Sequence, residues 1–140
     1  MTPGRPNRDD SPRRPERFDA ILEEVLASLP DELQRLLDEV PLVVEDSPTD
    51  DDLRHLGVRR PDGLCGLYTG IPLTHRSVEH SGTLPDVIRI FRRGIVAAAT
   101  DSRGQVTDRS LARQIRLTVL HEIGHHFGLG EEDLRRYGYG

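Results

Sequence analysis

The chain has 140 residues, which is enough for one domain with a modest core but not for two. Its formal net charge of −5 argues against a nucleic-acid partner, and its longest apolar run, Ile95–Ala99, is far too short to cross a membrane. All 19 basic side chains are arginines, so chemistry that needs a lysine nucleophile or Schiff base is excluded.

Residues 1–16 are expected to form a disordered tail. Four prolines lie among arginines and aspartates, and apart from these prolines Met1 is the only apolar residue before the first amphipathic pattern. Such a segment cannot bury enough apolar surface to offset its loss of conformational entropy. It also lacks the apolar core of a signal peptide, so we expect a cytoplasmic location, with a single folded domain over residues 17–140.

Two amphipathic helices are predicted next. Apolar residues recur at spacings of three and four from Phe18 to Leu29, and Pro30 ends this pattern. Asp31 opens a second and shorter helix, which ends before Pro41.

Three segments have the composition of β-strands: Leu42–Val44, Gly63–Gly70 and Val87–Phe91. The last is the strongest strand pattern in the chain, and it can pair antiparallel with Leu64–Thr69 across a long loop, Ile71–Leu84. Ile95–Ala99 fits a helix or a strand equally well. The acidic stretch Asp46–Asp52 lacks the spacing of a calcium loop, so a solvated loop or a helix start is expected there.

Three side chains outside the main motif invite a functional interpretation that the sequence does not support. Cys65 is the single cysteine, so no internal disulfide can form, and a small buried apolar role is expected for it. His75 and His80 lie in the predicted long loop, where histidines are more often surface residues than metal ligands.

The pattern H-E-x-x-H-x-x-G-x-x-E begins at His121, on a helix predicted to start near Thr107 or Asp108. On that helix His121 and His125 lie about 40° apart on one face, so both imidazoles can reach one metal ion. Glu122 lies beside this face, where it can act on a water without being a ligand. Composition alone would produce an H-E-x-x-H with a probability of only roughly 0.02.

A third ligand is sought after Gly128, which is expected to end the helix in a left-handed conformation and turn the chain back. Only 15 residues follow His125, and their carboxylates are Glu131, Glu132 and Asp133. A glutamate from a distant later helix is therefore excluded. Glu131 is the preferred third ligand, with Asp133 or an upstream group as rivals. The same acidic residues also suit the start of a short last helix.

Three blocks in this order resemble the minimal-zincin family, small bacterial proteins called zinc metallopeptidases largely from their metal motif: Gly66–Leu73, Leu84–Phe91 and His121–Gly128. The resemblance covers the chain from Phe18 to Tyr137. It implies a compact α+β fold, in which a small mixed β-sheet packs against helices that include the H-E-x-x-H helix. The family pattern usually has aspartate at the position of Glu131, which is one methylene longer.

The leading hypothesis is zinc-dependent hydrolysis of a peptide or protein substrate. One Zn²⁺ per chain would be held by His121, His125 and Glu131, with zinc as the default choice for these ligand types. Zinc would lower the pKa of a bound water, and Glu122 would carry the proton to the leaving amine as general base and acid.

Substrate recognition is less well defined. Tyr68, Tyr137 and Tyr139 are candidate donors to the oxyanion, although each is more often a packing or surface residue. The substrate backbone could pair as an added strand with Leu67–Gly70 or with Val87–Phe91. One alternative function is a zinc-binding interaction module of zincin fold without peptidase activity, and another is a degenerate zincin with an empty metal site. The oligomeric state is not indicated.

Overall fold

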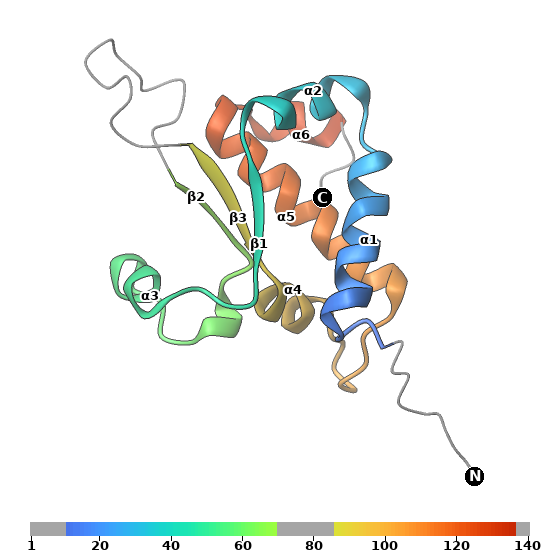
Figure 1. Ribbon diagram of the computed structural model, residues 1–140, viewed down its shortest axis with the longest axis vertical. Coiled ribbons are helices and arrows are strands. Elements are labelled where there is room, and N and C mark those ends of the chain that lie inside the picture. Colours follow the sequence, from blue (N-terminus) through green and yellow to red (C-terminus); the bar gives the residue numbers. More distant parts are fainter. Residues whose placement is uncertain (1–10, 70–85, 137–140) are drawn as a thin grey trace.

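A computed structural model of the protein describes residues 11–69 and 86–136 (Figure 1). The helices and strands in chain order are α1 (Pro15–Ala27), α2 (Asp31–Glu39), β1 (Leu42–Glu45), α3 (Asp50–Leu56), β2 (Gly66–Thr69), β3 (Val87–Phe91), α4 (Arg92–Ala99), α5 (Asp108–Phe127) and α6 (Glu131–Arg136). Among these residues no helix has both the length and the apolarity needed to cross a bilayer. The predicted loop Ile71–Leu84 and the candidates Tyr137 and Tyr139 lie outside the described ranges.

The elements agree with the sequence patterns, with small differences at their ends. Helix α1 begins at Pro15, because proline has no N–H to leave unpaired and suits a first helical turn. The last two residues of the segment 1–16 are therefore helical. Strand β2 is shorter than the predicted Gly63–Gly70, since Pro61–Gly63 forms a 3₁₀ turn before it. The ambiguous run Ile95–Ala99 is helical, within α4.

The three strands form one mixed sheet in the order β1–β3–β2. Strand β1 runs parallel to β3, and β2 runs antiparallel to it with Gly66 opposite Ile90 and Tyr68 opposite Ile88. The predicted antiparallel pairing is confirmed, and so is the compact α+β class. Because β3 lies in the middle, both of its edges are used, and β2 lies at one edge of the sheet that the described residues form.

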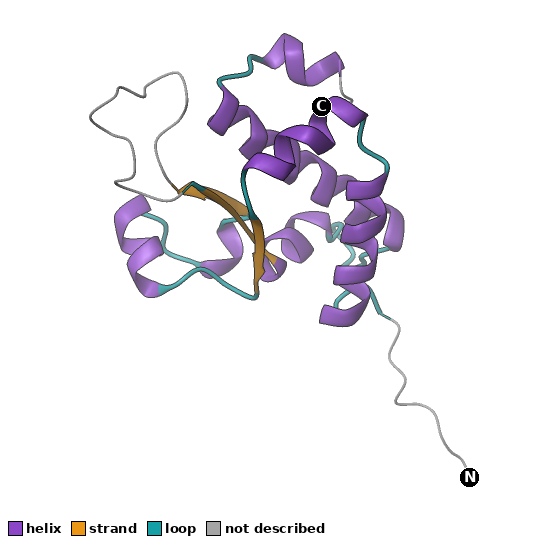
Figure 2. Ribbon diagram, turned by 45° about the horizontal axis from the view of Figure 1, so that its top comes forward, coloured by secondary structure: helices purple, strands orange, loops and turns teal. Residues whose placement is uncertain are grey.

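The main core lies between the sheet and the helices α1 and α5, whereas α3 lies on the opposite side of the sheet (Figures 1 and 2). Ile88 and Ile90 of β3 point into this core and are fully buried. Helix α5 packs against α1, α4 and the sheet, and contributes the buried residues Leu111, Ile115, Val119, Leu120 and Ile123. Burial of this whole side holds α5 in place.

Helix α3 is tied to the sheet by charge. Thr49 and Asp52 cap its start reciprocally, each side chain accepting a hydrogen bond from the other's backbone N–H. Arg89 of β3 donates to both oxygens of Asp52 and also to Glu45. This guanidinium holds the pKa of Asp52 well below its usual range. The acidic stretch thus contains a helix start, as expected, and the carboxylate of Asp52 holds α3 against the sheet through Arg89.

Gly94 in α4 lies very close to the backbone of the segment before β2. A Cβ atom at this position would lie 1.9 Å from the backbone oxygen of Leu64 and 2.6 Å from its carbonyl carbon. Only glycine lets α4 approach the chain this closely just before β2. This contact fixes the segment that leads into β2.

Candidate metal site

Helix α5 is defined by the local signals at its two ends. The Thr107 side chain accepts a hydrogen bond from the backbone N–H of Ser110, whose own hydroxyl accepts from the N–H of Thr107. At the other end Gly128 is left-handed, with φ of 69°, and the N–H of Leu129 donates to Gly124. The predicted cap and the predicted glycine stop are both confirmed. The motif therefore lies on the last turns of a rigid 20-residue helix.

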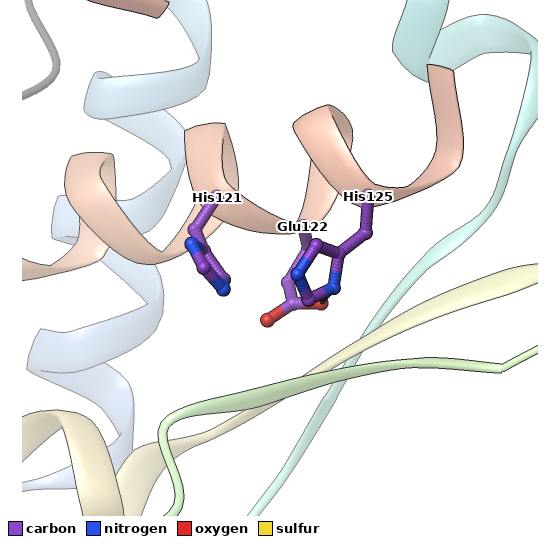
Figure 3. A group of neighbouring side chains, drawn as sticks. All are labelled: His121, Glu122 and His125. Carbon is purple, nitrogen blue, oxygen red and sulfur yellow. Dashed lines mark ion pairs between the residues drawn. The ribbon is translucent and has the colours of Figure 1, made fainter. Parts of the chain in front are cut away.

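The two motif histidines project from the same side of α5, with Glu122 between them (Figure 3). The ring centroids of His121 and His125 are 4.4 Å apart, and the three side chains offer ligand atoms that lie within 4.8 Å of one another. A tetrahedral ion with bonds of about 2.1 Å separates two nitrogen ligands by roughly 3.4 Å. Both side chains are exposed and project from the same side of α5, as their spacing of four predicted.

The electrostatic surroundings of His121 suit a neutral imidazole. Partial burial lowers the pKa of His121, and the neighbouring His125 lowers it further. A metal ion binds the unprotonated nitrogen of imidazole, so the environment favours the form of His121 that acts as a ligand.

Glu122 is the most unusual group of the site. Its side chain is only 5% exposed, and its Oε1 atom has no hydrogen-bond partner within the described parts of the chain. That oxygen lies 3.5 Å from Nδ1 of His125. Burial raises the pKa of Glu122 to about 7, against the opposing effect of a hydrogen bond from the backbone N–H of Tyr68. A buried carboxyl oxygen without a partner is costly unless a cation compensates it, so these residues fit a metal ion.

The raised pKa of Glu122 predicts how the zinc-free protein responds to pH. The folded pKa of about 7 exceeds the ordinary 4.5, so between these values the unfolded chain releases a proton that the folded chain keeps. The contribution of Glu122 to stability is therefore greatest below about pH 4.5 and is lost as pH rises to about 7, by an amount on the order of 1–3 kcal/mol.

Urea unfolding of chelator-treated protein at several pH values measures this loss, with Glu122→Gln as the reference that lacks the titrating group. If the unfolding free energy of the two proteins depended on pH in the same way, the raised pKa of the buried Glu122 carboxyl would be contradicted.

Glu122 also belongs to a buried polar stripe that joins α5 to β2. Among the described residues Thr118, Glu122 and His126 are polar yet at most 5% exposed, and their spacing of four places them on one helix face. Gly66 faces this stripe, because an added Cβ would lie 3.0 Å from Thr118 and 3.2 Å from Glu122. The sequence analysis missed the stripe, although its period of four was visible.

Tyr68 connects β2 to the stripe through both its backbone and its side chain. Its N–H bonds to Glu122, and its hydroxyl donates to Asp86 Oδ1 at 2.9 Å. Nδ1 of His126 lies 3.0 Å from the same hydroxyl oxygen. Since the single hydroxyl proton is given to Asp86, Nδ1 of His126 must carry a proton and donate. The hydroxyl of Tyr68, a candidate oxyanion donor by sequence, is therefore engaged in holding the strand.

The carboxylates that could be the third ligand differ in the hydrogen bonds that they already accept and in their exposure. Asp133 accepts from the backbone N–H of Gly130 at 3.2 Å and from Arg136 at 2.6 Å, so its carboxylate stabilises the first turn of α6. Glu132 is exposed. Glu131 is the first residue of α6, but its side chain lies outside what the structure describes, and its role as ligand stays a prediction.

Two imidazoles one turn apart, with a buried glutamate between them and an edge strand of the described sheet alongside, are the arrangement of a zincin-type metal site. The chain belongs to the zincin-like metallopeptidase family, whose model matches residues 37–139. A comparison with the curated proteins found no match. The family implies a zinc cofactor, and the cluster His121, Glu122 and His125 is where the described residues can hold one.

Proposed function

We propose that this protein is a zinc-dependent peptidase in which His121, His125 and Glu131 hold one Zn²⁺ and Glu122 transfers protons. The observation that carries the proposal is the buried Glu122 carboxyl, whose Oε1 lacks a hydrogen-bond partner among the described residues while it lies between two exposed imidazoles. When bound, zinc acts as a Lewis acid that lets water lose a proton near neutral pH.

Glu122 is suited to carry that proton. Its carboxyl is held by the N–H of Tyr68 and leaves Oε1 available on the side of the imidazoles. In the proposed reaction this oxygen accepts a proton from the attacking water and then delivers it to the nitrogen of the leaving amine. Burial excludes bulk water from the carboxyl, so the proton is kept within the site.

The position of β2 at the edge of the described sheet supports a peptide or protein as the substrate. Phe91 N–H donates to the Cys65 carbonyl, and since bonded pairs alternate along antiparallel strands, Gly66 and Tyr68 turn their backbone groups away from β3. The N–H of Tyr68 already binds Glu122, so in this proposal an extended peptide pairs with the edge at Gly66, close to that carboxyl. Val87–Phe91, the other candidate from the sequence, is the central strand and has no free edge.

Removal of one imidazole is expected to abolish zinc binding. His125→Ala leaves too few ligands to retain one zinc per chain after dialysis, and His121→Ala should behave in the same way. Both side chains are exposed, so the fold should persist. Metal analysis alongside circular dichroism measures the two effects.

The matched control is His55→Ala on α3, an exposed histidine whose ring contacts the Asp51 carbonyl. It should keep its zinc. A His125→Ala protein that still holds one zinc per chain would remove His125 from the proposed site.

The third ligand is tested by comparing two acidic residues of α6. Glu131→Ala should weaken zinc binding at least about tenfold, because the ion loses its only anionic ligand. Asp133→Ala removes a carboxylate that already binds Gly130 and Arg136, so it should lower the stability of α6 and leave zinc affinity nearly unchanged. Competition with a chromogenic chelator gives both affinities. The reverse order would assign the ligand to Asp133.

A further inference from the structure

A pocket of about 330 Å³ lies next to the proposed metal site, where it is bordered by His121 and Glu122. One wall is formed by the turns of α5 that precede His121, and the other by the segment that enters β2. The lining residues of the two walls are Gln114, Leu117 and Thr118, and Leu64, Cys65 and Gly66. The size is at the lower end for small-molecule sites and suits one side chain of a longer ligand.

The lining carries no charged side chain apart from the site's own His121 and Glu122. Leu64 and Leu117 are apolar and half-buried. Cys65 is half-buried as well, rather than the fully buried apolar residue expected from the sequence, and burial raises the pKa of its thiol. The thiol therefore stays neutral at physiological pH.

Gln114 supplies the polar character of the pocket, and its amide is only weakly engaged. Its Nε2 makes long contacts, 3.4 Å to Thr118 Oγ1 and 4.0 Å to Cys65 Sγ. Its side-chain carbonyl accepts no hydrogen bond from the residues that the structure describes. An amide in this state can turn to contact a ligand without giving up a strong bond.

We propose that this pocket receives a substrate side chain next to the scissile bond and selects an uncharged, mainly apolar one of the size of leucine or methionine. Gln114 and Cys65 are then specificity-determining residues. The inference rests on the proposed peptidase function, because the pocket adjoins both Glu122 and the outward-facing backbone of Gly66. A peptide paired with β2 thus passes the mouth of the pocket.

Charged side chains are disfavoured by the same lining. An aspartate would enter a largely apolar lining without a counter-ion and beside the Glu122 carboxyl, so its charge would not be compensated. A lysine would find no partner except Glu122, whose carboxyl faces the imidazoles. A leucine has no charged or polar group to desolvate, and it would bury apolar surface against Leu64 and Leu117.

The first test changes the charge of the pocket. Peptides that differ only in having leucine, lysine or aspartate at one varied position are offered to the zinc-loaded protein, and kcat/KM is measured for each. The wild type should prefer leucine. Gln114→Glu should raise the ratio of lysine to leucine cleavage at least about tenfold, the size expected for a new charge pair in a pocket. Gln105→Glu, the same change at an exposed residue outside the pocket, should keep the wild-type order.

The second test does not depend on cleavage. Cys65 is the only cysteine of the chain, so its rate of alkylation by iodoacetamide reports occupancy of the pocket. In the zinc-loaded Glu122→Gln protein the leucine peptide should slow this rate several-fold, and the aspartate peptide should not.

The outcomes separate the two proposals. Cleavage without side-chain preference, or an unchanged order in Gln114→Glu, overturns the pocket inference and leaves the peptidase proposal standing. Protection of Cys65 by the leucine peptide without any cleavage supports the pocket and overturns the peptidase proposal. If no peptide is cleaved and none protects Cys65, both are overturned.

Discussion

Replacing Glu122 with glutamine is expected to lower hydrolysis by a factor of about 10²–10⁴ while zinc content stays at one per chain. Glutamine keeps the shape of the side chain and can still accept the bond from the N–H of Tyr68 through its amide oxygen. It cannot take up a proton from water at neutral pH. The loss should therefore appear in kcat, with little change in KM.

The measurement needs metal analysis of the same preparation that is assayed, so that lost zinc is not mistaken for lost chemistry. Glu39→Gln on α2 is the control, because it makes the same change at an exposed position away from the site. Turnover by Glu122→Gln equal to that of the wild type, at equal zinc content, would defeat the role given to Glu122.

Replacing Gly94 with alanine is expected to destabilise the fold by about 4 kcal/mol, beyond the usual 1–3 for overpacking. Helix propensity alone predicts the opposite, a gain of about 1 kcal/mol inside α4. The steric effect should win because the new Cβ would lie 1.9 Å from the backbone oxygen of Leu64. A backbone atom cannot move aside by a bond rotation, so α4 or the entry to β2 must shift.

Urea denaturation gives the change in unfolding free energy, and its sign alone decides between propensity and packing. Gly63→Ala is the control, since a Cβ there would meet only Val58, at an ordinary 3.8 Å. It should change stability by less than about 1 kcal/mol. A Gly94→Ala protein as stable as the wild type would show that α4 does not pack as closely as this against the backbone of Leu64.

The parts of the structure that follow from local physics were predictable from the sequence. Thr107 and Gly128 mark the ends of α5 through bonds within a few residues, and a spacing of four brings His121 and His125 to one face. The antiparallel pairing of β2 with β3 was also predicted. The confirmed predictions concern residues that are close in the chain, as at the ends of α5, or segments with a strong strand pattern, as in the pairing of β2 with β3.

The features that depend on distant contacts were not predictable. Nothing in the local pattern of Val87–Phe91 says that β1 will pair on its other side, which places β2 at an edge of the sheet that the described residues form. Glu122 is buried against Gly66, which lies 56 positions earlier and where an added Cβ would lie 3.2 Å from the Glu122 side chain. The sequence ranks Glu131 above Asp133 as a ligand, but it does not show that the Asp133 carboxylate already accepts hydrogen bonds from Gly130 and Arg136.

The amide of Tyr68 that contacts Glu122 belongs to the main chain, and this has a consequence for substitutions at this position. Every amino acid except proline brings the same N–H to that position. Replacement of Tyr68 by any residue except proline and tyrosine itself would therefore remove the hydroxyl contacts to Asp86 and His126 but keep the N–H that Glu122 accepts.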